Sequence, residues 1–127
     1  MRDPARKYRR AVILLGRLGL NGWAAWVCRW ALRRCPAYRA EFLVLLAHYR
    51  AELGDGDHAV EALELSARES PLEADALLGL AGVYCEKEHR FEEASSYYVR
   101  ALSTPGETSK EFRADLRNRL QRCRAAL

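Results

Sequence analysis

Residues 59–71, AVEALELSARESP, carry the pattern that decides the fold of this 127-residue chain. Ala59 is followed after four residues by Leu63 and after seven residues by Ser66, and Pro71 closes the segment. Spacings of four and seven place side chains on one face of an α-helix. Proline disfavours helical geometry at the residue before it. The segment is therefore predicted to be an amphipathic helix that stops before Pro71.

The same pattern occurs twice more in the chain. The copy before it and the copy after it consist of Ala24, Cys28, Ala31 and Pro36, and of Ala94, Tyr98, Ala101 and Pro105. Successive alanines are 35 residues apart, and successive prolines are 35 and 34 residues apart. A period of this length is typical of proteins built from repeated pairs of helices.

A second register of apolar residues precedes each copy and predicts a second helix in every period. Its members are Tyr8 with Ala11 and Val12, Leu43 with Leu46 and Ala47, and Leu77 with Leu80 and Ala81. Glycine-containing turns, 18–22 and 53–57, separate the first two pairs of helices. The third turn, 87–91, has no glycine and is expected to be one residue longer.

The last twenty residues predict one further helix. Between positions 108 and 127 an apolar stripe contains Phe112, Leu116, Leu120 and Cys123, and the opposite face is rich in arginine. Such a helix is expected to cover the open side of the last pair.

This arrangement resembles the tetratricopeptide repeat family. The likeness rests on the pairs Leu46-Ala47 and Leu80-Ala81, the series Ala59-Leu63-Ser66, the run Phe91-Glu92-Glu93-Ala94, and Tyr84. The family's first-helix tryptophan is absent, and Arg50 stands where a tyrosine is usual. The resemblance implies a single all-α domain, residues 1–127, in which the repeats form a right-handed superhelical stack. The repeats are expected at about 5–36, 40–71 and 74–105, and the capping helix at about 108–127.

Composition and charge narrow the function. Half of the residues are hydrophobic, which excludes a disordered tail, and the most apolar stretch, 11–32, is interrupted by Arg17, Asn21 and Arg29, so no spanning helix is expected. Residues 1–40 carry a net charge of +9, residues 41–95 carry −9, and residues 96–127 carry +4. A uniformly basic nucleic-acid binder would not contain that acidic middle. Four cysteines without CxxC spacing indicate free thiols in a reducing compartment, so a cytoplasmic location is expected.

No catalytic motif is present, and the chain is expected not to be an enzyme. His48, His58 and His89 lack the spacing of a helical metal pair. Cys28 and Cys35 lie two turns apart on one helix. Cys28, however, occupies the repeat position that Leu63 occupies 35 residues later, so it is interpreted as a core residue. We expect no metal, no cofactor and no catalytic residue.

In the family, the first helix of each repeat lines a concave groove, and the resemblance implies a groove here. The expected lining is Arg6, Arg9, Arg10, Ile13 and Arg17, then Glu41, Val44, Leu45, His48 and Glu52, then Asp75, Leu78, Gly79, Gly82 and Glu86. A groove with a basic end, an apolar floor and acidic edges suits a helix or an extended peptide. The alternative is that Val44, Leu45 and Leu78 pack between neighbouring repeats.

Some members of the family clamp the C-terminal carboxylate of heat-shock chaperones with Lys, Asn and Arg side chains. The matching positions here include Arg9, but also Ile13, Leu45, Asp75 and Gly79. Asp75 would repel a carboxylate, so this ligand is expected not to bind.

Three tryptophans form a second candidate surface. Trp23, Trp26 and Trp30 lie off the line of Ala24, Cys28 and Ala31, and Arg29, Arg33 and Arg34 flank them. Later repeats hold Glu61 and Leu65, then Ser96 and Arg100, in the places of Trp26 and Trp30. A protein contact, with a partner or a second copy of this chain, is one interpretation. An anionic membrane surface and packing beneath the N-terminal segment are the others.

The sequence thus favours a non-enzymatic protein-binding module that acts as an adaptor, a scaffold or a chaperone-like subunit. It would hold a partner in the groove, on the tryptophan face, or on both. The alternative function is binding to a membrane surface or to nucleic acid through the basic N-terminal region.

Overall fold

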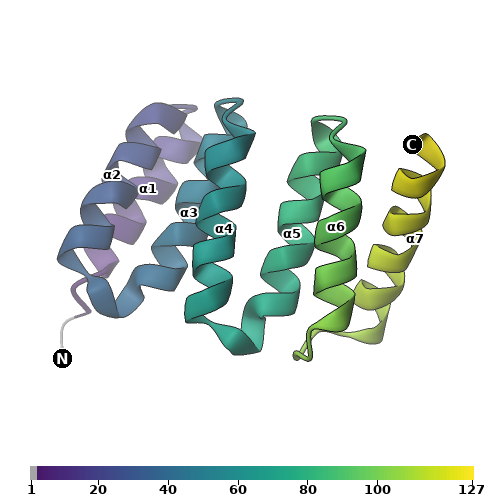
Figure 1. Ribbon diagram of the computed structural model, residues 1–127. Helices are drawn as coiled ribbons and strands as arrows, with labels where there is room; N and C mark the ends of the chain where they lie inside the picture. Colours follow the sequence, from purple (N-terminus) through teal and green to yellow (C-terminus); the bar gives the residue numbers. More distant parts are fainter. Residues whose placement is uncertain (1–2) are drawn as a thin grey trace. The chain divides into compact units, whose positions relative to one another are not determined.

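The computed structural model describes residues 3–127, and all regular structure in this part of the chain is helical (Figure 1). The elements are α1 (Arg6–Arg17), α2 (Asn21–Arg34), η1 (Pro36–Tyr38), α3 (Arg39–Glu52), α4 (Gly56–Glu69), η2 (Pro71–Glu73), α5 (Ala74–Lys87), α6 (Phe91–Ser103) and α7 (Lys110–Ala126). The two η elements are single 3₁₀ turns that begin at a proline. No strand occurs among the described residues, and the predicted all-α fold is confirmed.

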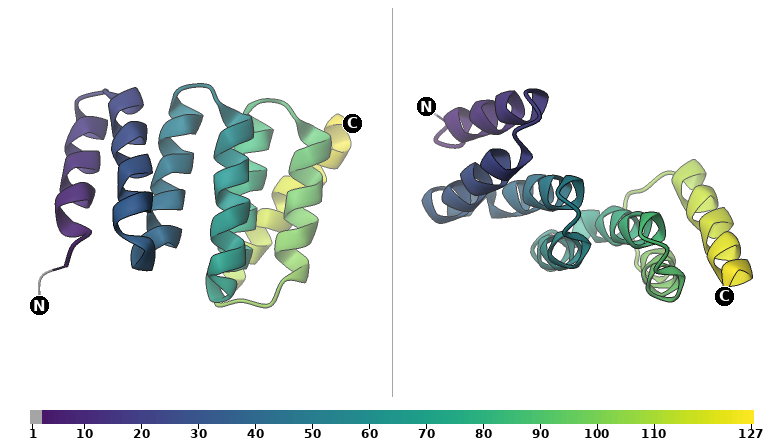
Figure 2. Two further views of the ribbon diagram at one scale, coloured as in Figure 1. Left: turned by 60° about the vertical axis from the view of Figure 1, so that its left-hand side comes forward. Right: turned by 90° about the horizontal axis from the view of Figure 1, so that it is seen from above.

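The chain divides into two compact units. One ends at Ala62 and the other comprises Leu63–Leu127, so the division falls within α4. In the first unit α1 packs on α2 and α2 packs on α3; in the second, α5 packs on α6 and α6 packs on α7. The connected helices α1 and α2, and likewise α5 and α6, run antiparallel (Figure 2). The superhelical stack and the single domain remain predictions.

Three turns share one backbone conformation. Gly19 and Gly54 adopt positive φ angles of 75° and 80°, and His89, 35 residues further along, adopts a φ of 60°. Each of these residues is the middle of a three-residue connection between two helices. The expectation of a longer third turn is wrong, because histidine takes the left-handed conformation that glycine takes in the first two turns.

The positions that define the sequence period are buried. The three small residues that begin the pattern, the larger residues four positions later and the small residues seven positions later are each at most 1% exposed. They are Ala24, Ala59 and Ala94; Cys28, Leu63 and Tyr98; and Ala31, Ser66 and Ala101. Small residues let two helices approach closely, and the residue between them fills the space that remains. The 35-residue period is thus a period of core packing.

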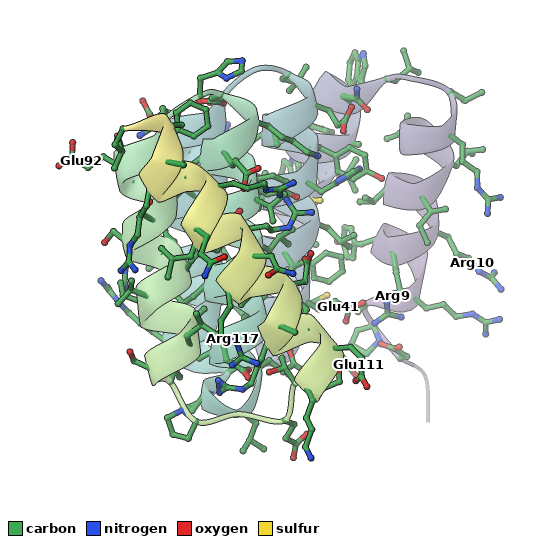
Figure 3. All side chains as sticks on the ribbon, turned by 90° about the vertical axis from the view of Figure 1, so that its right-hand side faces the viewer. Arg9, Arg10, Glu41, Glu92, Glu111 and Arg117 are labelled. Atoms are coloured by element: carbon green, nitrogen blue, oxygen red, sulfur yellow. The ribbon has the colours of Figure 1, made fainter. Side chains whose placement is uncertain are left out.

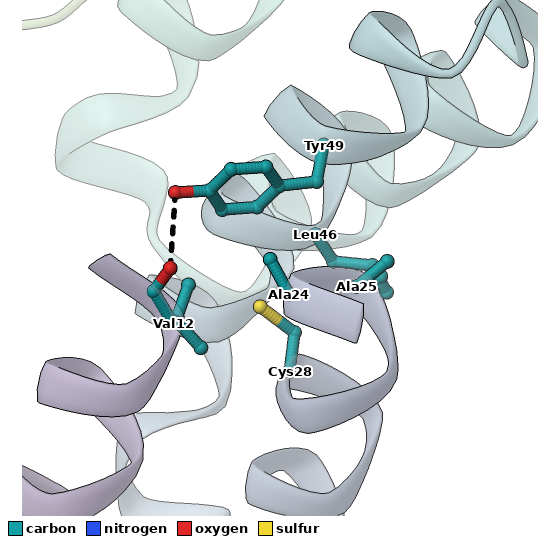
Figure 4. Close-up of a cluster of buried hydrophobic side chains, with 6 residues drawn as sticks. All are labelled: Val12, Ala24, Ala25, Cys28, Leu46 and Tyr49. Carbon is teal, nitrogen blue, oxygen red and sulfur yellow. Dashed lines mark hydrogen bonds between the residues drawn. The ribbon is translucent and has the colours of Figure 1, made fainter. Parts of the chain in front are cut away.

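The core of the first unit lies among α1, α2 and α3 (Figure 4). Val12 from α1, Cys28 from α2 and Leu46 from α3 meet there, and the Tyr49 hydroxyl donates a hydrogen bond to the Val12 carbonyl oxygen at 3.4 Å. Gly16 makes room for that tyrosine, because a Cβ at this position would lie 2.3 Å from the tyrosine oxygen.

Helix α7 is fixed to the rest of the second unit at its start and along one face. The Ser109 hydroxyl caps the helix by accepting a hydrogen bond from the Phe112 amide at 3.1 Å. Arg113 donates to the carbonyl oxygens of Leu102 and Thr104 at the end of α6, at 3.2 and 2.9 Å. The predicted stripe faces inward, since Leu116, Leu120 and Cys123 are buried and Phe112 is half-buried.

No helix within residues 3–127 combines the length and the apolar character that crossing a membrane requires.

Candidate functional site

One end of the predicted groove is closed by an ion pair within the first unit. Arg9 on α1 and Glu41 on α3 face each other (Figure 3), and the guanidinium donates two hydrogen bonds to the carboxylate, one of them from Nη2 at 2.9 Å. Nη1 of Arg9 also lies 3.1 Å from the Asp3 carboxylate. The bonds to Glu41 and Asp3 raise the pKa of Arg9 above its usual range. Arg9 and Glu41 therefore join α1 to α3.

The other end of this groove is an open hollow between α1 and α3. Its lining includes Ile13 and Arg17 from α1 and His48, Tyr49 and Glu52 from α3. Ile13 is 42% exposed, and Arg17, His48 and Glu52 are also exposed. An accessible apolar side chain beside a basic, an acidic and an aromatic side chain can hold a short peptide segment.

Other predicted groove residues of this unit have different surroundings. Leu45 packs against both buried clusters of the unit, so it belongs to the core. Val44 is half-buried. Arg6 and Arg10 are exposed and line a separate hollow that α1 shares with the end of α2.

The predicted groove residues of the third repeat are mostly buried within the second unit. Asp75 is 1% exposed and Leu78 is 6% exposed. Asp75 accepts hydrogen bonds from the Thr108 hydroxyl and from the Ala76 amide. Gly79 contacts α7, since a Cβ there would lie 3.0 Å from Phe112.

Gly82 contacts α6, where a Cβ would lie 2.5 Å from the ring of Tyr98. The expectation that Asp75, Leu78, Gly79 and Gly82 are open to a ligand is wrong. The error comes from the third turn. Expecting an extra residue in that turn places the third set of groove positions one residue too early relative to the first two sets.

Glu86 is the centre of a polar cluster in the second unit. Its carboxylate accepts a hydrogen bond from the Tyr98 hydroxyl at 2.7 Å and lies 3.4 Å from Arg122 and 3.7 Å from Arg119. Burial, followed by the bond to Glu86, raises the pKa of Tyr98. These contacts join α5, α6 and α7. Glu86, which was expected to contact a ligand, therefore contacts the other helices of its own unit.

The tryptophans form an exposed ladder along α2. Trp23, Trp26 and Trp30 are 61%, 50% and 37% exposed, so the interpretation that they pack beneath the N-terminal segment is wrong. Adjacent rings meet edge to face, with centroids 6.0 Å apart for Trp23 and Trp26 and 5.7 Å apart for Trp26 and Trp30. Arg29 and Arg33 line a shallow hollow with Trp26 and Trp30.

A basic hollow adjoins this ladder. It measures about 1020 Å³, and its lining includes Arg6, Lys7 and Arg10 from α1, Arg34 from the end of α2, and one acidic residue, Asp3, which pairs with Arg9. The Arg34 guanidinium lies 5.4 Å from the centre of the Trp30 ring, which connects the hollow to the ladder. Sequence reasoning missed this hollow, although an antiparallel hairpin necessarily brings the start of α1 beside the end of α2.

The cysteine side chains are buried, and each histidine side chain contacts a neighbouring residue. None of the four cysteines forms a disulfide bond. Burial raises the pKa of Cys28 to about 12, which keeps its thiol protonated at neutral pH. His58 lies 2.8 Å from Asp55, and the His48 ring stands edge-on to Tyr49. Among the described residues, no group of three or more His, Cys, Asp or Glu side chains is placed to hold a metal ion.

The sequence matches no protein-family model and no curated protein sequence.

Proposed function

We propose that this protein is a non-enzymatic protein-binding module built from tetratricopeptide-like helical hairpins. The support for this class is the 35-residue period of buried positions. In each of α2, α4 and α6 a small residue, a larger residue and a second small residue are buried in the same order. A right-handed superhelical stack of the three hairpins belongs to the proposal. An adaptor or a scaffold subunit is the role that such a module would fill.

The observation that carries the proposal is the open hollow between α1 and α3. Ile13 offers an accessible apolar contact there, and Arg17 and Glu52 offer charges of both signs. A partner would enter as a helix or an extended segment with an apolar residue seated on Ile13 and polar groups toward Arg17 and Glu52. Arg9 and Glu41 would limit how far it extends, because their carboxylate and guanidinium are already paired.

The test places a photo-crosslinking side chain at Ile13 or His48 in the full-length protein and, as a matched control, at the exposed Arg124 of α7. We expect the first two positions to crosslink to the same short segment of one protein, and the control not to do so. A synthetic peptide of that segment should bind the wild type and should bind Ile13→Glu about 30-fold more weakly, because a central apolar contact contributes about 2 kcal/mol.

Two results would contradict the proposal. One is crosslinking to the same proteins from the α7 control position, which would mean that the hollow confers no specificity. The other is an Ile13→Glu variant that stays folded by circular dichroism and binds the peptide as well as the wild type does.

A further inference from the structure

Exposed apolar side chains are concentrated in one hairpin. Of the eleven large hydrophobic side chains that are exposed among residues 3–127, seven belong to α1, α2 and the turn between them. They are Ile13, Leu14, Leu18, Leu20, Trp23, Trp26 and Trp30. Leu18, at 64% exposure, and Leu20 stand at the tip of the hairpin, and the tryptophan ladder begins three residues after that tip.

The charge of this hairpin has a single sign. Residues 6–34 contain eight Arg or Lys and no Asp or Glu. Among the ion pairs of the described residues, those that involve this segment all belong to Arg9. Arg29 and Arg33 lie beside the ladder, and the basic hollow at the other end of the hairpin gathers further cations from both helices. Cations therefore flank the Trp26–Trp30 part of the ladder and continue beyond it into the basic hollow.

We propose that the α1–α2 hairpin docks on the surface of an anionic phospholipid bilayer. The indole rings of the ladder would lie at headgroup depth, where tryptophan is favoured because it has an apolar body and a polar N–H group. Leu18 and Leu20 would enter the boundary with the acyl chains. Arg29, Arg33 and the cations of the basic hollow would contact lipid phosphates.

The charges favour a bilayer over a two-fold contact between the ladders of two copies of this chain. A two-fold contact between two ladders would bring Arg29 and Arg33 of one copy against the same residues of the other, and like charges repel. The exposed face of α7 carries Arg117 and Arg124, so it does not complement the ladder either. A bilayer surface supplies anions across its whole area and accommodates a protruding tip without needing a matching pocket.

The test measures tryptophan emission and co-sedimentation with vesicles of phosphatidylcholine alone and of phosphatidylcholine with about one third phosphatidylserine. All three tryptophans of the chain lie in the ladder, so their emission reports this face alone. We expect a blue shift and co-sedimentation with the anionic vesicles, little of either with the neutral ones, and a loss of binding as salt is raised.

Two pairs of variants separate specific docking from general attraction. Arg29→Gln with Arg33→Gln should weaken binding to anionic vesicles about 25-fold, because each cation at such a surface strengthens binding about fivefold. The matched control, Arg117→Gln with Arg124→Gln on α7, should bind as the wild type does. Trp26→Ala with Trp30→Ala should lose most of the binding, whereas Val99→Ala, an exposed apolar residue of α6, should lose none.

Several outcomes would overturn this proposal. One is that the folded protein does not bind anionic vesicles. Another is that the α7 control variant loses as much binding as the variant with Arg29→Gln and Arg33→Gln. A blue shift that grows with protein concentration without lipid would indicate self-association instead. An equal shift with a short DNA duplex would assign the face to nucleic acid, and an equal shift with inorganic phosphate would reduce the site to a small-anion site. Crosslinking from His48 on α3, which lies outside the hairpin, tests the α1–α3 hollow separately from this surface.

Discussion

The α1–α2 hairpin and the α5–α6 hairpin bury the same repeat positions but present different outer surfaces. In α2, Trp23 and Trp26 lie near the buried Ala24. The equivalent positions of α6, two periods of 35 residues later, hold Glu93 and Ser96. Helix α7 covers part of the α5–α6 hairpin with Leu116 and Leu120. The packing pattern of a repeat and the chemistry of its exposed side therefore vary independently.

The largest expected difference in stability lies between truncating a buried side chain packed on the α5–α6 hairpin and truncating an exposed one of the α1–α2 hairpin. Leu116→Ala should lower the free energy of unfolding by about 2–5 kcal/mol, because Leu116 is 2% exposed and its loss leaves a cavity between α7 and α5. Trp26→Ala should cost about 1 kcal/mol or less, since it removes two ring contacts at an exposed site. Denaturant titrations followed by far-UV circular dichroism measure both. Equal losses would mean that the ladder is a core element.

A smaller difference in stability is expected between alanine substitutions of two glycines, Gly82 in α5 and Gly22 in α2. Gly82→Ala should cost about 1–3 kcal/mol, because its methyl group would collide with the ring of Tyr98. Gly22→Ala should leave the stability unchanged or raise it slightly, since no side chain lies within 4 Å of a Cβ at the start of α2. The same titrations apply, and a stabilised Gly82→Ala variant would show that α5 and α6 are less closely packed than described.

The smallest effect concerns the turns. His89→Gly should raise the free energy of unfolding by about 0.5–1 kcal/mol, because glycine adopts positive φ without steric cost. Gly54→Ala, at the equivalent position, should lower it by about 1 kcal/mol. Thermal melts of both variants measure the difference. A His89→Gly variant that is less stable than the wild type would indicate that the ring contact of His89 with Phe91 outweighs the strain.

Much of this fold follows from the sequence, and the errors have physical causes. Ala24, Ala59 and Ala94 predict buried helix contacts because their spacing and small size recur together. The third set of groove residues is misplaced because Leu77 follows Leu43 by 34 residues and suggests a step of that length. His89 follows Gly54 by 35 residues and shows the true step, through a positive φ that composition does not reveal.

The candidate surfaces were predictable to different degrees. The exposure of Trp26 follows from the polar residues, Glu61 and Ser96, at its equivalent positions. The basic hollow does not follow from any local pattern, because Lys7 and Arg34 are far apart in sequence and meet only when the hairpin closes. The sequence assigns Glu86 to the expected groove, and only the packing of α6 and α7 gives it its partners.

The confinement of every tryptophan to one exposed ridge has a practical consequence for spectroscopy. Indole emission depends on the polarity around the ring, and these rings already face water in the folded chain. Unfolding should therefore change the intrinsic fluorescence little, and a melt followed at that wavelength could be mistaken for the absence of a transition. The six tyrosines, of which Tyr98 is fully buried, make near-ultraviolet absorbance the more informative optical signal.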